Sequence, residues 1–397
     1  MAPADPTYPL YPVACLVASC MLLLVLLTSF IRHSWNLGVA FLCFWLFLES
    51  LIVGINAIIW SDNADIKYYV YCDIATHIEE ITLVVKPMST FIITRRLYLI
   101  TSLRSVHLPG LAAKRRELAI ECTLGLIIPL IVAGPLYYIV QSYRFGVLGG
   151  FGCETAGDNS VLGLFIAWSW SVIFPLLSMT VYYPRVIWIL YCQRRDANEF
   201  LQSDNSVSRT NYFRIFALAS IDIFLTLPMG IVNIVLSISG SISNTGSFPL
   251  YGGWTAIHTD WDPVGIMAGA QLGGAQGYFS RWTSPVLAFA IFGLFGATRE
   301  ARASYWRAIH TVCGWVGCIP MSDTNGTGPA LGTIELGERP RDSTIDLEIG
   351  SGRTPEDDAE SGKEGEVQVL KGALDAEKMG GSSLKCVADR DDGLVFK

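Results

Sequence analysis

Long apolar stretches separated by short polar segments make up the first three quarters of the chain. The apolar residues form continuous blocks without the spacing of an amphipathic surface helix, and about 20 such residues suffice to cross a bilayer as a helix. Six blocks satisfy this requirement: 10–31, 37–60, 118–140, 161–183, 215–238 and 275–297. The pattern predicts an all-α membrane protein.

A seventh block, residues 72–94, is apolar overall but contains five ionisable side chains. They are Asp73, His77, Glu79, Glu80 and Lys86. Ionisable groups within a membrane span usually face a cavity or one another, because exposure to lipid is costly. We therefore expect this block to be the third helix of a seven-helix transmembrane core, residues 10–297, with its charged side turned inward.

Basic residues are distributed unequally between the two sides of the predicted membrane. One side has fifteen Lys and Arg residues, whereas the other has only Lys67 and Arg144. Cytoplasmic loops carry the excess of positive charge in membrane proteins. The bias predicts an extracellular N-terminus, residues 1–9, and a cytoplasmic C-terminus. The basic side consists of the segments 32–36, 95–116, 184–214 and 298–334.

Composition agrees with a membrane protein that ends in a polar tail. Hydrophobic residues make up 51% of the 397 residues and charged residues only 16%, which excludes an ordinary soluble domain. The net charge of −7 arises after position 334, where sixteen acidic and nine basic residues occur. We expect residues 319–397 to be a disordered acidic cytoplasmic tail. Residues 298–318 fit an amphipathic juxtamembrane helix or, alternatively, an ordinary stop-transfer flank.

The outer part of the third block predicts a polar group at one depth of the bundle. Asp73, His77 and Glu80 share a helical face, since residues three, four or seven apart are neighbours. Arg281 lies at a similar depth in the last block. We expect Arg281 to pair with Glu79 or Glu80, and this outer group to line a binding cavity.

A second charge pair is expected deeper in the bundle. Lys86 lies past the middle of the third block, and Glu49 and Asp222 lie at matching depths in the second and sixth blocks. We expect Lys86 to pair with Glu49 or Asp222, and our hypothesis is that this pair latches the helices and acts as a switch. Alternatively, both charge pairs are static and only fix the register of the helices.

Two cysteines fall on the outer side of the predicted membrane. Cys72 begins the third block and Cys153 lies in the second outer loop. Thiols in an oxidising compartment readily form a disulfide. We expect the pair to be bridged, which would pin the loop over the mouth of the bundle.

Seven spans are compatible with several functional classes. A retinal protein needs a lysine in the last span, and 275–297 contains none. A metal-dependent hydrolase needs a second, metal-spaced histidine after His77, which is also missing. No internal repeat typical of secondary transporters is apparent. Long basic inner loops and a polar outer cavity favour a receptor, with a small-solute transporter that uses the same polar cluster as the alternative.

Eight short segments stand out in order across the membrane core. They are RHSWNLG (32–38), INAIIW (55–60), CDIATHI (72–78), TRRLYLI (94–100), GPLYYIVQSYRFGVLGGFGC (134–153), LPMG (227–230), WTAIH (254–258) and FGATREARASY (295–305). Together they resemble the fungal mating pheromone receptors of the a-factor-receptor type, which are class D G-protein-coupled receptors. RHSWN and YGGWTAIHTDWD differ in detail from the family pattern, which leaves the identity of the ligand open.

The resemblance implies a plasma-membrane receptor that binds a prenylated peptide pheromone and signals to a heterotrimeric G protein. It implies no catalysis, cofactor, metal or nucleic-acid partner. An apolar ligand with a few polar groups needs aromatic walls and sparse polar anchors. We expect ligand contacts from Asp73, His77, Glu80, Tyr143, Phe145, Trp254, His258 and Arg281. We expect G-protein contacts from Arg95, Arg96, Lys114, Arg115 and Arg116, although these residues alternatively serve only to set the topology.

Overall fold

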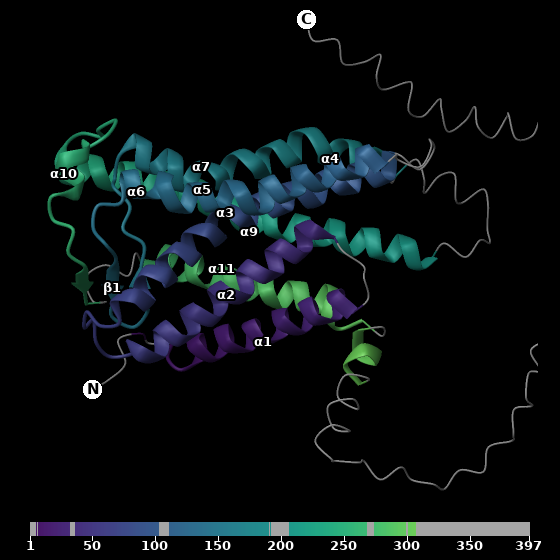
Figure 1. The fold of residues 1–397 in the computed structure, drawn as a ribbon, viewed down its shortest axis with the longest axis horizontal. Helices are drawn as coiled ribbons and strands as arrows, with labels where there is room; N and C mark the ends of the chain where they lie inside the picture. Colours follow the sequence, from purple (N-terminus) through teal and green to yellow (C-terminus); the bar gives the residue numbers. More distant parts are fainter. Residues whose placement is uncertain are drawn as a thin grey trace, which may run out of the picture. The chain divides into compact units, whose positions relative to one another are not determined.

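The apolar blocks of the sequence become long helices that lie side by side (Figure 1). The computed structural model describes residues 5, 7–31, 36–102, 111–189, 191, 206–267, 274–298 and 301–306. The described helices belong to the unit Met1–Cys318. Its long helices are α1 (Leu10–Ile31), α2 (Leu37–Ile59), α3 (Tyr69–Ser102), α4 (Leu111–Cys122), α7 (Val161–Leu177), α9 (Ser206–Thr245) and α11 (Gly274–Ile291).

Five helices of the described residues are long and apolar enough to cross a membrane. They are Leu10–Phe30, Leu37–Ile59, Leu111–Val140, Val161–Ile189 and Phe213–Ser243. Helices α3 and α11 lie in the same bundle, because α3 packs against α2, α7 and α9, and α11 packs against α1 and α9. The charged residues of α3 lower its hydropathy, although the helix is longer than any of these five spans.

Helix α3 separates two apolar clusters of the bundle. Ile93 packs with side chains of α1, α2, α9 and α11. Val84 and Met88, on another side of α3, pack with side chains of α7 and of the helical segment before it. Burial of α3 between these clusters leaves Glu80 and Lys86 with protein or an internal cavity to face.

Prolines accompany local changes of helical geometry. The predicted span 118–140 lies within the longer helical stretch Leu111–Val140, which continues from α4 through α5 (Ile128–Ile131) and α6 (Tyr137–Val140), with π-helical turns at Thr123–Ile127 and Val132–Leu136. Pro129 and Pro135 lie within or directly after these turns, where the missing backbone N–H interrupts the α-helical hydrogen bonds.

A small sheet departs from the predicted all-α architecture. Strands β1 (Gly146–Leu148), β2 (Gly152–Glu154) and β3 (Val264–Ile266) form a sheet in the order β2-β1-β3. β1 runs antiparallel to β2 and parallel to β3. Three-residue strands within glycine-rich loops have no readable apolar alternation, so the sequence gives little sign of them.

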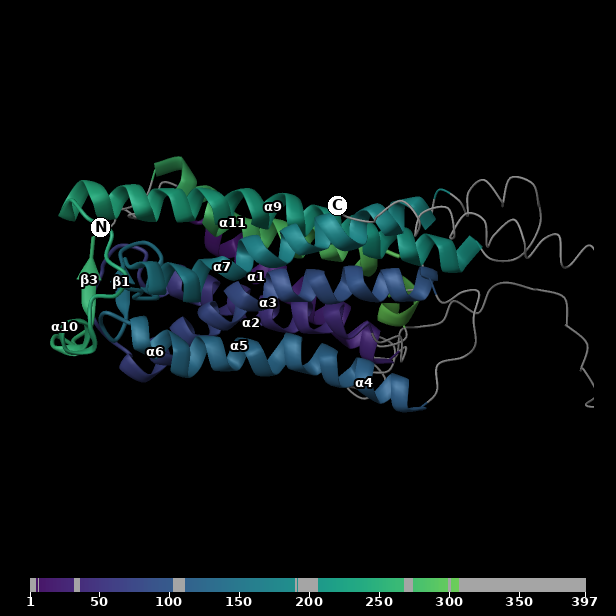
Figure 2. The same ribbon diagram turned by 90° about the horizontal axis from the view of Figure 1, so that it is seen from above.

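The sheet and the basic residues lie at opposite ends of the helix bundle. Figure 2 shows β1, β3 and helix α10 (Trp254–His258) at one end, which we call the sheet end, and the beginning of α4 at the other, which we call the basic end. A disulfide joins Cys72 at the start of α3 to Cys153 in β2, with 5.4 Å between the Cα atoms. The bridge predicted from the sequence joins the same two cysteines.

Other predicted segments lie partly or wholly outside the described residues. Residues 301–306 are helical, but the rest of the expected juxtamembrane helix 298–318 falls outside the description except for residue 298. The expected tail, 319–397, lies entirely outside it, as do residues 1–4 and 6 of the expected outer segment.

Substitution of Gly152 by alanine is expected to destabilise the sheet end. Gly152 has a φ of +88°, and an added Cβ would lie 2.7 Å from Asn56 Cβ and 2.8 Å from Trp60 Cε3. We expect a loss of about 1–3 kcal/mol in the free energy of unfolding. Thermal unfolding of the purified protein measures it. Gly157→Ala is the matched control, because no atom lies within 4 Å of a Cβ there; equal stability of the two variants would contradict this account of the loop.

Candidate ligand-binding site

A cavity of about 510 Å³ lies among the helices in the half of the bundle nearer the sheet end. The loop that follows β2 covers part of it, with Glu154, Thr155 and Asp158 in its lining. The helices contribute a mixture of apolar, polar and charged side chains. Those used below are Glu49, Ser50, Glu79, Glu80, Lys86, Ser280, Arg281 and Ser284.

Lys86 connects α3 to two other helices at the deeper side of the cavity. Its Nζ atom donates hydrogen bonds to Glu49 Oε1 of α2 at 3.0 Å and to Ser284 Oγ of α11 at 2.7 Å. The sequence leaves Glu49 and Asp222 as possible partners of Lys86, and in the structure Glu49 is in direct contact with it. The ammonium group thus links three helices through charge-assisted hydrogen bonds.

Asp222 lies on α9 in a separate buried contact with α3. Its carboxylate accepts hydrogen bonds from the hydroxyl groups of Thr90 on α3 and Thr226 on its own helix. The side chain is buried. Thr90 is one helical turn beyond Lys86, so the two polar contacts follow each other along α3.

Arg281 has a partner that differs from the expected one. The sequence predicts an ion pair with Glu79 or Glu80, whereas the guanidinium of Arg281 pairs with Glu154 at the end of β2. The same guanidinium lies 4.1 Å from the ring centroid of Phe151. The ion pair therefore joins the end of β2 to α11.

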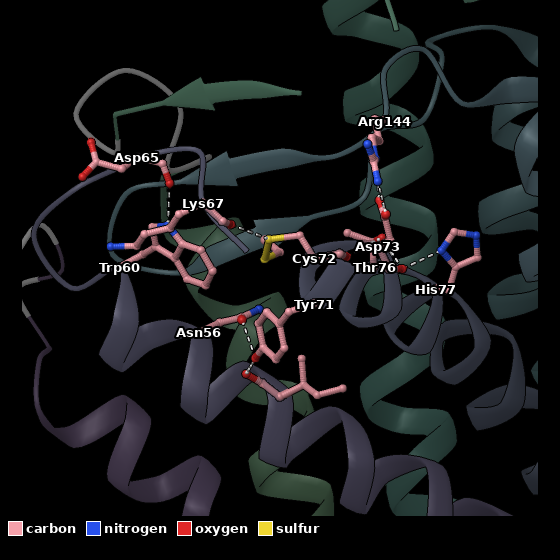
Figure 3. Close-up of a disulfide and its surroundings, with 12 residues drawn as sticks. Asn56, Trp60, Asp65, Lys67, Tyr71, Cys72, Asp73, Thr76, His77 and Arg144 are labelled. Carbon is pink, nitrogen blue, oxygen red and sulfur yellow. Dashed lines mark hydrogen bonds and ion pairs between the residues drawn. A yellow bond between two sulfur atoms is a disulfide. The ribbon is translucent and has the colours of Figure 1, made fainter. Parts of the chain in front are cut away.

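Asp73 also pairs with the loop. Arg144 donates to both Asp73 oxygens, from Nε at 3.0 Å and from Nη2 at 2.5 Å (Figure 3). Hydrogen bonding to Asp73 raises the pKa of Arg144, so its guanidinium stays charged. The Asp73 contact therefore fastens the loop beside the disulfide, and Asp73 is not among the residues that line the cavity.

Three further predicted ligand contacts lie beside the cavity and do not line it. His77 Nδ1 is 2.7 Å from the Asp73 carbonyl oxygen, and its ring packs edge-on against Tyr137. Phe145 is buried in the cluster under the sheet. Tyr143 lies in the same loop, where burial raises the pKa of its hydroxyl.

Trp254 and His258 belong to an aromatic cluster at the sheet end. The His258 ring stacks on Trp254 with 4.1 Å between centroids and on Trp261 with 5.1 Å. Tyr138 packs against all three rings. The cluster lies outside the lining of the cavity, so of the eight expected ligand contacts only Glu80 and Arg281 face it.

At the basic end, two expected G-protein contacts form ion pairs between α3 and α4. Arg95 Nη2 is 2.8 Å from Glu117 Oε1, and Arg96 Nη1 is 3.5 Å from Glu121 Oε2. The other expected contacts lie in the first two turns of α4, where their side chains are exposed. They are Lys114, Arg115 and Arg116.

Several polar groups of the site were not predicted, because no depth in the membrane can be assigned to a residue outside the spans and an uncharged residue within a span gives no polar signal. Glu154 lies in a loop, and Ser284, Thr90 and Ser50 are uncharged residues in apolar blocks. Each becomes part of a polar contact or cavity wall in the structure. Small hydroxyl residues at the depth of a buried charge are the one signal that could have indicated Ser284 and Thr90.

The helices, their apolar surfaces and the polar cavity among them define a multi-pass helical membrane protein. The family model described as pheromone A receptor matches residues 10–315, which include every described helix of the bundle. The chain therefore belongs to the pheromone A receptor family.

Individual relatives agree with this assignment. The chain is 30% identical over 332 residues to the pheromone B alpha 3 receptor of Schizophyllum commune, covering 82% of this chain and 52% of that protein. It is 31% identical over 314 residues to pheromone receptor 2 of Mycosarcoma maydis, covering 76% and 87%. It is 21% identical over 309 residues to the pheromone a factor receptor of Saccharomyces cerevisiae, covering 75% of this chain and 62% of that protein. The chain thus spans about half the length of the Schizophyllum relative.

Proposed function

We propose that this protein is a plasma-membrane receptor for a prenylated peptide pheromone, coupled to a heterotrimeric G protein. In this proposal seven helices cross the bilayer, with α3 and α11 added to the five apolar spans. The sheet end faces the exterior and the basic end faces the cytoplasm. The observation that carries the proposal is the family match over residues 10–315, which covers the whole bundle.

The cavity suits a ligand that arrives from the exterior. Its lining combines apolar side chains such as Val53, Leu83 and Trp168 with a few charged groups, as expected for a ligand that has an apolar chain and polar anchors. The disulfide and the Arg144–Asp73 pair fix the loop beside this cavity. Ligand binding at the sheet end therefore acts on a preformed site.

A row of polar side chains along α3 offers a route from the cavity to the basic end. Lys86, Thr90 and Thr94 are spaced by four residues, and Thr94 Oγ1 lies 3.3 Å from Ser178 Oγ next to α7. These residues bond α3 to α2, α11, α9 and the turn after α7. A ligand that favours one arrangement of these bonds would shift the population of helix positions at the basic end.

Expression in a pheromone-response reporter strain tests the proposal. The strain lacks its own receptor of this family and is challenged with synthetic farnesylated and unfarnesylated peptide libraries. We expect a response to farnesylated peptides that depends on the strain's G protein. Solute uptake into receptor vesicles, with no nucleotide exchange on the G protein, would instead support the transporter alternative and contradict the proposal.

Neutralising the two arginines at the basic end of α3 is expected to impair coupling to the G protein. In Arg95→Gln/Arg96→Gln both α3–α4 ion pairs are lost. Glu117 is partly exposed, so the loss of its pair costs up to about 1 kcal/mol. Glu121 is buried, so the loss of Arg96 costs more, and unchanged ligand binding is the measure that the fold survives. We expect at least about a tenfold loss of ligand-stimulated nucleotide exchange, with ligand binding unchanged. Lys67→Gln, which removes one basic charge at the sheet end, is the control; equal losses of binding and exchange would indicate misfolding and contradict the assignment.

A further inference from the structure

The cavity contains more acidic than basic side chains. Its charged lining residues are Glu49, Glu79, Glu80, Lys86, Glu154, Asp158 and Arg281. Lys86 pairs with Glu49, and Arg281 pairs with Glu154. These two ion pairs use both basic groups. Within the described part of the chain, Glu79, Glu80 and Asp158 have no basic residue in an ion pair with them.

Glu79 is the least satisfied of the three carboxyl groups. No described residue forms a hydrogen bond with it. Its acidic neighbours are Glu154, Glu49 and Glu80, each of which opposes a negative charge on Glu79. Its basic neighbour is Arg281, which is already engaged by Glu154. Like charges gathered away from bulk water repel one another strongly.

The two remaining carboxyl groups, Glu80 and Asp158, differ in their contacts. Glu80 is buried and has Thr155 as its side-chain hydrogen-bond partner. Asp158 Oδ2 is buried and has no hydrogen-bond partner within the described residues. Neither contact neutralises a negative charge.

Other polar atoms of the cavity-lining residues also lack partners within the described residues. The Ser50 side chain is 1% exposed and lines the cavity, yet its Oγ atom has no hydrogen-bond partner among the residues described. Glu49 uses Oε1 for Lys86, whereas its Oε2 atom is buried and unpaired in the same part of the chain. A buried polar atom without a partner destabilises the protein, and a ligand that supplies the missing bonds recovers that free energy.

We infer that the ligand places a positively charged group, an ammonium or a guanidinium, in this cavity against Glu79 and Glu49 Oε2, with Ser50 Oγ as a further hydrogen-bond acceptor. The inference rests on the proposed function, since it describes the polar part of the proposed peptide ligand. Carboxylates bind such donors through short charge-assisted hydrogen bonds. An organic cation fits better than a metal ion, because no group of three metal-ligating side chains occurs among the described residues.

The geometry also links binding of the ligand cation to the contacts that Lys86 makes between helices. Glu49 would then hold the ligand cation through Oε2 and Lys86 through Oε1, so that two cations share one carboxylate. Sharing weakens the bond from Lys86 to α2 and leaves Ser284 on α11 as its other partner. The ligand cation thereby acts on the contact that joins three helices.

Affinity selection from a peptide library tests the inference. The full-length receptor in lipid nanodiscs is exposed to random-sequence peptides that end in S-farnesylcysteine methyl ester, and the retained peptides are sequenced. Each retained peptide is then resynthesised with its lysine, arginine or free amine replaced by a neutral isostere. We expect this change to weaken binding at least about tenfold to the unmodified receptor, as the loss of a charge-assisted hydrogen bond predicts.

Two variants assign the effect to the cavity. In Glu79→Gln, the cationic and neutral peptides should bind with affinities within about threefold of each other, whereas Asp62→Asn, which removes an acidic charge outside the cavity, should keep the preference. Retained peptides that lack a cation, or a preference unchanged in Glu79→Gln, would overturn the inference while leaving the receptor proposal intact. Retention of no farnesylated peptide would overturn both.

Discussion

Lys86→Met is expected to destabilise the receptor by about 3–5 kcal/mol, which would abolish both surface expression and signalling. The substitution leaves the Glu49 carboxylate charged and without its cation inside the bundle, and it removes the hydrogen bond to Ser284. Thermal unfolding of the purified protein and quantification of receptor at the cell surface measure the loss. Lys114→Met is the matched control for stability and surface expression, because that lysine is exposed at the start of α4.

A second substitution distinguishes a switch from a static ion pair. Lys86→Met/Glu49→Gln removes the uncompensated charge, and replacing both members of a buried pair is often nearly neutral for stability. We expect most of the stability to return while signalling remains impaired, because the shared carboxylate and its cation are gone. Recovery of signalling together with stability would show that the pair only fixes helix register, and a stable Lys86→Met variant would contradict its structural role.

Removing the disulfide is the second change with a large expected effect. Cys153→Ala should reduce the free energy of unfolding by about 2–5 kcal/mol, because the bridge closes a loop between residues 81 positions apart. It should also weaken ligand binding, since β2 carries Glu154, the partner of Arg281. Unfolding measured with and without reductant tests the stability, and titration with a retained farnesylated peptide tests the binding.

A free cysteine provides the control for this change. Cys20→Ala replaces an exposed thiol of α1 that forms no disulfide, so it should leave both quantities unchanged. If Cys153→Ala were as stable as Cys20→Ala and bound the peptide equally well, the loop would not need the bridge to hold its position over the cavity.

The helices were largely predictable because their apolar blocks are long and end at polar segments. Predicted spans 10–31 and 37–60 agree with α1 and α2 to within one residue. The third block, predicted at 72–94, becomes the longer helix Tyr69–Ser102, because the basic residues that follow the apolar block continue the helix. Hydropathy detects the apolar part of a helix and misses a polar extension.

The pairing of charges was predictable only where both partners lie on helices. Lys86 meets Glu49, one of the two partners that depth suggests, because both positions follow from the rise of a helix. The partners of Arg281 and Asp73 are Glu154 and Arg144, which lie in a loop. Their positions depend on the sheet and on loop folding, and neither has a sequence period from which a depth could be read.

In the proposed receptor the cavity opens to the exterior, while the basic end lies in the cytoplasm. Cysteine accessibility in intact cells tests it most directly, with every cysteine except Cys72 and Cys153 replaced by alanine. We predict that a membrane-impermeant thiol reagent modifies Ser280→Cys, in the cavity lining, and modifies Lys114→Cys only after the membrane is permeabilised. Modification of Lys114→Cys in intact cells, with Ser280→Cys protected, would contradict the account.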